Sequence, residues 1–335
     1  MEARAAGWIC RPRACSTAVP IVAARRSTTF DGRLSACGEG AELRLSTADG
    51  VATSALAPLC DTYRVTALDV PFELVENQVV AGFTIGGRGP YVCLLDTAVD
   101  PSVVDLALAR ELGLDVRDDA PGEAAGQGSE PTAFYPSELP DVRLGEFEVG
   151  DVEAVAADLS GLGSKLNRPL HAILGQSFFD GHVVQFDYRN RRVRFNAHSF
   201  ERGVRADIEG AADLTPIVTV HVNAATVPVV LDTGSSLTLG IYLESVEKLG
   251  LGEAFASATP RASMGARGHI DAYEGAVHSL ALGDVHLSPA AVVFLPRAHV
   301  DPTPRALGNL GNGFLQHTVL TLDYPRRELY IAAAT

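Results

Sequence analysis

The sequence predicts a mostly β protein built from two copies of one lobe. Short apolar stretches that alternate with polar residues run from Val70 to the C-terminus, separated by Gly, Asn and Pro turns. An apolar run leads into an Asp twice, at Asp96 and Asp232, which are 136 positions apart. Gly175 and Gly311 have the same separation, which is too long for a solenoid repeat. We therefore expect two lobes related by a pseudo-twofold axis, each a small β-barrel-like unit with one or two short helices.

The composition is that of a globular protein, with 335 residues of which 47% are hydrophobic and 20% charged. The formal net charge of −14 repels phosphate backbones, so we expect no nucleic-acid partner. No apolar run approaches the roughly 18 residues of a membrane-spanning helix, so we expect no transmembrane segment. The five cysteines are odd in number and lack a Cys-x-x-Cys pair, so we expect no metal and no cofactor. A cytoplasmic and an exported location both fit this composition.

The chain divides into three predicted segments. Residues 1–66 form an N-terminal extension that we expect to be partly disordered, 67–200 form lobe one, and 210–335 form lobe two. Residues 1–33 are rich in Arg and Ala and lack periodicity, so a transit peptide, an export signal and translated sequence upstream of the true start all remain open. Polar residues and scattered Gly over 196–215 predict a linker between the lobes.

In lobe one, alternation and turn residues predict strands on both sides of Asp96, with a helix after it. The helix is predicted from apolar spacing that stops at Gly113, a residue suited to a helix C-terminus. The expected elements are a strand at 78–85, a turn at 86–89, a strand at 90–95, the helix at 103–112, a loop at 117–131, a hairpin within 142–155, an apolar segment at 172–175, and two strands within 183–195.

In lobe two, the same order of elements restarts after the linker and leads into Asp232. A second Gly, Gly250, stands where the predicted helix should end. The expected elements are a strand at 217–222, a turn at 223–226, a strand at 228–231, a short helix at 242–249, a hairpin around 282–283, an apolar segment at 308–311, and two strands within 319–331.

Two carboxylates at equivalent positions predict a chemistry. If the lobes pack about the pseudo-twofold axis, Asp96 and Asp232 face each other. Ionised carboxylates about 4 Å apart repel by about 4 kcal/mol at an effective dielectric constant of about 20, so one proton is shared between them. The ionised carboxylate can take a proton from water while the protonated one polarises a carbonyl group, which is general acid–base hydrolysis of an amide. The hydroxyls of Thr97 and Thr233 suit a structural role that ties the two turns together.

This ordered set of motifs resembles the aspartic peptidases. Each lobe is similar to a retropepsin-like unit, in which an apolar strand runs into the Asp turn, a flap hairpin follows, and two apolar residues precede a Gly. The last motif is Ile173–Gly175 in lobe one and, in weaker form, Asn309–Gly311 in lobe two. The likeness covers residues 69–333, and both lobes are in one chain, as in pepsins. It implies that a monomer is sufficient and that Asp96 and Asp232 hydrolyse a peptide or protein substrate in a cleft between the lobes.

The resemblance also implies which residues support the two carboxylates: Thr97 and Ala98 in lobe one, and Thr233, Gly234 and Ser235 in lobe two. Ala98 stands where the family motif has Gly. An Ala at positive φ would cost about 1 kcal/mol, and its methyl group would intrude on the floor of the cleft. A non-catalytic peptide-binding protein on the same fold is therefore the alternative hypothesis.

Two flap tips are expected, at 126–128 and 265–268, where Gly residues cluster between predicted strands. Three aromatic residues near these tips, Phe134, Tyr135 and Tyr273, are candidates for substrate contact, although ordinary packing is the more frequent role of such side chains.

Overall fold

The computed structural model of the protein divides into two compact units, Met1–Tyr63 and Arg64–Thr335. In the first unit it describes one antiparallel hairpin of β1 (Arg44–Thr47) and β2 (Gly50–Thr53). The rest of the predicted extension over 1–66 lies outside the described residues, and so does the expectation that it is partly disordered. The structure describes residues 44–47, 50–53, 68–117, 122–123, 133–196, 203–208, 215–265, 268–298 and 303–334.

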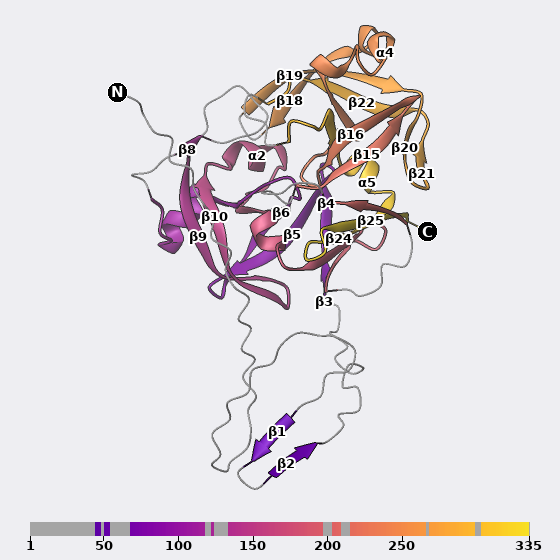
Figure 1. The fold of residues 1–335 in the computed structure, drawn as a ribbon. Helices are drawn as coiled ribbons and strands as arrows, with labels where there is room; N and C mark the ends of the chain where they lie inside the picture. The colour runs from indigo at the N-terminus through magenta and orange to yellow at the C-terminus, as the bar shows by residue number, and fades with distance from the viewer. Residues whose placement is uncertain are drawn as a thin grey trace, which may run out of the picture. The chain divides into compact units, whose positions relative to one another are not determined.

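The second unit is mostly β and contains two repeated lobes, so the predicted fold class is confirmed (Figure 1). The predicted lobe limits, 67–200 and 210–335, stay a prediction. Short helices interrupt the strands in each lobe. The described part of lobe one has three α-helices, so the prediction of one or two short helices is wrong by one for that lobe. Among the described residues, no helix has the length and apolar character needed to cross a bilayer.

Lobe one is a sheet that closes on itself. Its strands have the order β4-β5-β6-β11-β7-β10-β9-β8, and an additional pairing of β5 with β9 joins the two sides into a barrel-like unit. Its elements are β4 (Glu73–Val75), β5 (Gln78–Ile85), β6 (Arg88–Leu95), β7 (Ser102–Asp105), α1 (Leu106–Leu112), β8 (Gly122–Glu123), β9 (Ala133–Leu144), β10 (Phe147–Ala157), α2 (Ser160–Lys165), β11 (Ala172–Leu174) and α3 (Gln176–Phe179).

Lobe two is a nine-stranded sheet of the order β18-β19-β22-β17-β23-β16-β15-β20-β21. The strand into the Asp is central in both lobes and pairs in parallel with the short apolar strand of the second motif. The elements of lobe two are β15 (Ile217–Val222), β16 (Ala225–Leu231), β17 (Leu239–Tyr242), η2 (Leu243–Ser245), α4 (Gly252–Ala256), β18 (Thr259–Gly265), β19 (Gly268–Val277), β20 (Leu280–Leu282), β21 (Val285–Leu287), β22 (Ala290–Leu295), β23 (Gly308–Leu310) and α5 (Asn312–Leu315).

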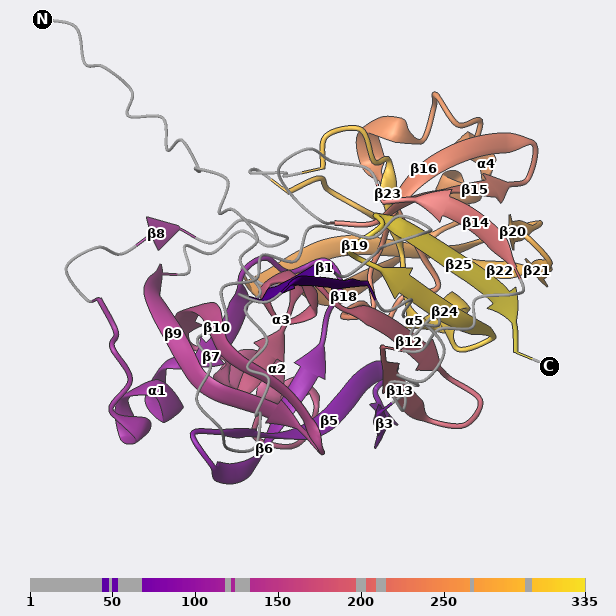
Figure 2. The same cartoon turned by 60° about the horizontal axis from the view of Figure 1, so that its bottom comes forward.

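A six-stranded sheet is shared by the two lobes (Figure 2). At its centre β12 of lobe one pairs antiparallel with β24 of lobe two, and Gln185 lies opposite its own counterpart, Thr321. The Nε2 of Gln185 donates to the hydroxyl of Thr321 at 2.9 Å. The sheet runs in the order β14 (Val204–Asp207), β25 (Glu328–Ala333), β24 (Thr318–Asp323), β12 (Val183–Asp187), β13 (Arg192–Phe195) and β3 (Leu68–Pro71).

The helix predicted over 103–112 is only partly correct. Val103 and Val104 belong to β7, and the helix starts at Leu106. β-Branched side chains favour a strand, and β7 pairs with both β10 and β11. The carboxylate of Asp105 accepts from the backbone N–H of Leu108 at 3.1 Å and caps the helix. The predicted end is confirmed, because Gly113 has a φ of 71°.

Lobe two differs from the predictions at two places. The helix predicted over 242–249 is wrong, because Tyr242 ends β17 and only one 3₁₀ turn, Leu243–Ser245, follows it. Part of the linker predicted over 196–215 is also wrong. Val204–Asp207 forms β14 and pairs with β25, just as Leu68–Pro71 pairs with β13 in lobe one. This strand is therefore one more element of the repeat.

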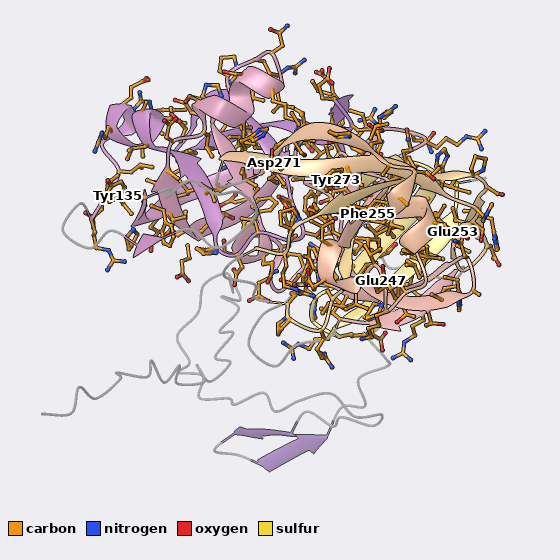
Figure 3. The ribbon with its side chains drawn as sticks, turned by 90° about the horizontal axis from the view of Figure 1, so that it is seen from above. Tyr135, Glu247, Glu253, Phe255, Asp271 and Tyr273 are labelled. Carbon is orange, nitrogen blue, oxygen red and sulfur yellow. The ribbon has the colours of Figure 1, made fainter. Side chains whose placement is uncertain are left out.

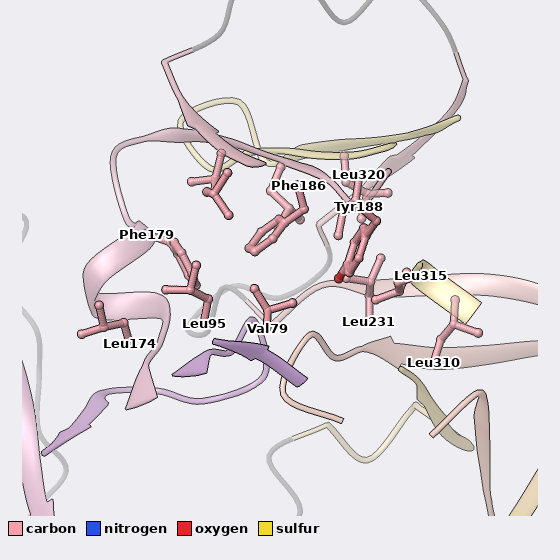
Figure 4. Close-up of a cluster of buried hydrophobic side chains, with 14 of the residues drawn as sticks. Val79, Leu95, Leu174, Phe179, Phe186, Tyr188, Leu231, Leu310, Leu315 and Leu320 are labelled. Carbon is pink, nitrogen blue, oxygen red and sulfur yellow. The ribbon is translucent and has the colours of Figure 1, made fainter. Parts of the chain in front are cut away.

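The main apolar core lies beneath the ends of the two strands that lead into the Asp residues. Leu95 and Leu231 immediately precede the carboxylates, and both side chains are fully buried. They belong to one cluster that takes side chains from both lobes, including Phe186 of the shared sheet (Figure 4). The position of each Asp is therefore fixed from below by close-packed side chains.

Candidate active site

Each Asp occupies the same place in its lobe. Asp96 follows β6, and its backbone N–H donates to the carbonyl oxygen of Leu174 at 3.0 Å. Asp232 follows β16, and its N–H donates to the carbonyl oxygen of Leu310 at 2.9 Å. The apolar segment of the second motif thus lies beside the Asp turn in both lobes, as the repeat predicts.

Thr97 and Thr233 join the two turns by four hydrogen bonds. The backbone N–H of each threonine donates to the hydroxyl of the other, at 3.0 Å for Thr97 and 3.1 Å for Thr233. The hydroxyl of Thr97 donates to the carbonyl oxygen of Leu231 at 2.7 Å, and that of Thr233 to Leu95 at 2.8 Å. Both threonines are fully buried. These reciprocal bonds set the spacing of the two Asp residues through the backbone.

The two carboxyl groups lie close enough for each to perturb the pKa of the other. Each also accepts from a backbone N–H two residues on. Ala98 donates to Oδ1 of Asp96 at 2.8 Å, and Gly234 donates to Oδ1 of Asp232 at 3.0 Å. The side chain of Asn309 adds a third contact, from Nδ2 to Oδ2 of Asp232 at 3.1 Å. The pair therefore lies in a polar, donor-rich setting above an apolar core.

Burial is the main cause that raises the pKa values of both carboxyls, and their other neighbours act differently on each. Burial raises the pKa of Asp96 well above its ordinary value, and the negative charge of Asp232 raises it further. Burial also raises the pKa of Asp232, but Asn309 and the backbone N–H groups of Gly234 and Ser235 oppose that rise. The pair consequently holds one proton over a range in which isolated carboxylates are ionised.

Ala98 and Gly234 are not equivalent. The backbone at Ala98 does not have a positive φ, so the strain considered from the sequence does not arise. A Cβ added to Gly234, in contrast, would lie 2.0 Å from Oδ2 of Asp96. The turn of lobe two therefore needs a residue without a side chain at this position, because a Cβ there would collide with the carboxyl of Asp96.

Three polar side chains support the turn of lobe two, and no local sequence pattern predicts this role for them. The Nε2 of Gln78 donates to the carbonyl oxygen of Gly234 at 2.6 Å. The Nδ2 of Asn312 donates to the carbonyl oxygen of Thr233 at 2.6 Å, and the hydroxyl of Tyr188 donates to Oδ1 of Asn312 at 2.6 Å. Gln78 and Tyr188 come from lobe one, so that lobe supports the turn of its partner.

The flap candidates are described in part. Residues 126–128 lie outside the described residues, whereas Gly265 at the end of β18 pairs with Gly268 at the start of β19. Tyr273 lies in β19 and packs edge-on against Phe255, with ring centroids 5.3 Å apart (Figure 3). This is a packing role for Tyr273. Across the described ranges, no group of three or more His, Cys, Asp or Glu side chains could hold a metal ion.

Two repeated β lobes, each with an Asp turn at the end of a buried strand and with the two turns joined by reciprocal threonine bonds, define a bilobal acid-protease fold. A family model described as aspartyl protease matches the chain twice, over residues 81–178 and 218–314. The two matches cover more than half of the chain and fall on the two lobes. The chain therefore belongs to the aspartyl protease family. No curated protein matches the chain.

Proposed function

We propose that the protein is a single-chain aspartic endopeptidase in which Asp96 and Asp232 hydrolyse peptide bonds. The observation that supports this most directly is the set of four threonine bonds, which joins the two turns that carry Asp96 and Asp232. Because one chain supplies both carboxyls, a monomer is sufficient for the site.

In the proposed reaction the pair starts with one proton. The ionised carboxylate removes a proton from a water molecule, and the water oxygen forms a bond to the peptide carbonyl carbon. The protonated carboxyl gives its proton to the carbonyl oxygen. In the second step the carboxyl that took the proton from water gives it to the amide nitrogen, and the C–N bond breaks. A hydroxyl of the tetrahedral intermediate returns its proton to the other carboxylate, so the acid product is released and the pair again holds one proton. No covalent bond to the protein forms at any stage.

A second candidate function follows from Ala98. Its methyl group lies in the turn beside Asp96, where the family has no side chain, and could exclude the geometry needed for attack on the carbonyl group. In that case the protein would bind peptides without cleaving them. The ordinary backbone at Ala98 and its intact N–H bond to Asp96 favour the endopeptidase.

A peptide-library experiment tests the proposal. The purified protein is incubated with a mixed peptide library from about pH 3 to pH 7, with and without pepstatin, and products are identified by mass spectrometry. Asp96→Asn and Asp232→Asn should each lower kcat/KM by at least about 10²–10⁴-fold, because each removes one partner of the acid–base pair. Asp284→Asn, at an exposed turn of lobe two, is the matched control.

Cleavage that persists unchanged in Asp232→Asn would contradict the mechanism. Ala98→Gly separates the two candidate functions. The endopeptidase proposal expects its activity to stay within a few-fold of the natural protein. Cleavage that appears only in Ala98→Gly, together with peptide binding by the natural protein in calorimetry, would favour the binding protein instead.

A further inference from the structure

Asn309 breaks the symmetry of the two lobes beside the carboxyl pair. Its counterpart 136 positions earlier is Ile173, and both residues lie on the short strand next to the strand into the Asp. Ile173 packs in an apolar cluster with Leu94 and Leu170. Asn309 instead donates from Nδ2 to Oδ2 of Asp232 at 3.1 Å. One carboxyl of the pair thus has a side-chain amide donor where the other lobe has an apolar side chain.

The residue opposite Asn309 on the neighbouring strand also differs between the two lobes. On β17 the cross-strand partner of Asn309 is Gly240, whereas the partner of Ile173 on β7 is Val103. A Cβ on Gly240 would lie 2.1 Å from Oδ1 of Asn309. The Gly therefore leaves the room that the amide occupies, and the valine of lobe one fills the corresponding space with apolar packing.

The carbonyl oxygen of the Asn309 side chain, in contrast, makes no such contact within the described part of the chain. Oδ1 of Asn309 is buried and has no hydrogen-bond partner among the described residues. A buried acceptor without a partner destabilises the fold, and an apolar residue of similar size would avoid that penalty. The contact from Nδ2 to Asp232 is the feature of Asn309 that an apolar side chain could not supply.

Building on the proposed dyad chemistry, we infer that Asn309 is a positioning residue that keeps Asp232 as the ionised carboxylate and leaves the shared proton on Asp96. An N–H donor stabilises a carboxylate more than it stabilises a carboxylic acid. Asp232 is then the base that takes the proton from water, and Asp96 is the acid that protonates the carbonyl oxygen.

The other titratable groups that face the pair do not compete for this role. Tyr188, which follows β12, is influenced by the charge of Asp232, and Tyr324, which follows β24, by that of Asp96. Burial raises the pKa of both phenols, so both stay neutral where the carboxyls titrate. Among the described residues, the groups of the pair that titrate in this range are thus Asp96 and Asp232 themselves.

Carboxyl ¹³C NMR titration of the intact protein, with and without Asn309→Leu, tests the inference. Removal of the donor destabilises Asp232 only when it is ionised. The lower of the two macroscopic pKa values of the pair should therefore rise by about one unit. The upper value should hardly move, because Asp232 is ionised both before and after the second proton leaves. The carbon that titrates first should be that of Asp232 in the natural protein.

A second variant keeps the amide but moves it. In Gly240→Ala the new methyl group displaces Oδ1 of Asn309, and the same upward shift of the lower pKa is expected. Ile173→Leu, an apolar exchange at the equivalent position of lobe one, should leave both values in place. Lower pKa values within about 0.2 unit of the natural protein in both Asn309→Leu and Gly240→Ala would overturn the inference.

The titration does not depend on catalysis, so it separates this inference from the proposed function. If the protein cleaves peptides, the acid limb of kcat/KM against pH should move upward by about one unit in Asn309→Leu, equal to a tenfold loss at the lowest pH, while the alkaline limb stays. If the protein only binds peptides, the NMR shift is still expected and the cleavage assay is silent.

Discussion

Lobe one and lobe two have the same backbone arrangement at the carboxyl pair but different side chains beside each carboxyl. The four threonine bonds are reciprocal, with matching lengths in the two directions. The side chains beside the carboxyls are not matched. Lobe one has Ala98 and Ile173, whereas lobe two has Gly234 and Asn309. A duplicated fold can thus keep two carboxyls in register while it gives each a different environment, which is what an acid and a base working as a pair require.

Among exchanges that test the difference between the lobes, the largest effect is expected from the one that imposes the lobe-one turn on lobe two. In Gly234→Ala the new Cβ would lie 2.0 Å from Oδ2 of Asp96, so the carboxyl must move. A displacement of about 1 Å in a catalytic group lowers activity by about 10²-fold, and we expect at least that loss in kcat/KM. Steady-state kinetics on a peptide identified from the library measure it.

Ala98→Gly is the reciprocal exchange and the control for Gly234→Ala. Near-normal activity in Gly234→Ala would mean that both turns tolerate a methyl group, and the distinction between the two lobes at this position would be lost.

The next effect concerns stability and should be equal in the two lobes. Thr97→Val and Thr233→Val each remove a hydroxyl that accepts one bond and donates another, and each leaves a buried N–H and a buried carbonyl unpaired. The expected loss is about 1–3 kcal/mol for each unpaired group in the free energy of unfolding. Urea denaturation measures it, with Thr97→Ser and Thr233→Ser as controls that keep the hydroxyls. Losses that differ by more than about 1 kcal/mol between the lobes would show that the bonds of Thr97 and Thr233 do not contribute equally to stability.

The smallest effect is the pH dependence of stability. A carboxyl whose folded pKa lies above the unfolded value of 3.8 contributes stability below that value, and the contribution is lost as pH rises through the folded pKa. Asp96→Asn should therefore melt at a higher temperature than the natural protein at pH 7, and the difference should vanish below the unfolded pKa. Each 1 kcal/mol corresponds to roughly 2–4 °C in a domain of this size.

Asp232→Asn should show a smaller gain, because the side chain of Asn309 stabilises the ionised form of Asp232 in addition to backbone donors of the kind that both carboxyls have. An equal gain in the two variants, recorded by calorimetry across the pH range, would show that the lobes do not differ in this respect.

Much of the fold could be predicted because a few residues recur at equal spacing and reveal the repeat. Asp96 and Asp232 end apolar strands, and equal offsets place the rest of each lobe. The strand at Val103 and Val104 was harder to predict, since its apolar spacing also fits a helix and its two neighbouring strands are remote in the sequence. Val204–Asp207 is an edge strand of four residues, too short for its alternation to identify it, and its pairing with β25 is what defines it.

The candidate site was predicted at its centre and missed at its edge. The Asp-Thr turns are local motifs, so the sequence alone predicts them. Asn309 was visible only as a polar residue in an otherwise apolar motif. The orientation of the Asn309 side chain depends on the space left by Gly240 on another strand, and no local sequence pattern relates these two residues. Gln78 likewise reaches the turn of lobe two from lobe one, across 156 positions of sequence.

The threonine bonds have a mechanical consequence. A lobe that rotated against its partner at the pseudo-twofold axis would have to break all four bonds together, since each threonine bonds to both the N–H and the strand end of the opposite lobe. The two turns therefore move as one rigid body. If the protein opens to admit a ligand, the motion has to occur in parts of the lobes other than these two turns. The distance between the two carboxyls that share the proton then stays unchanged during that motion.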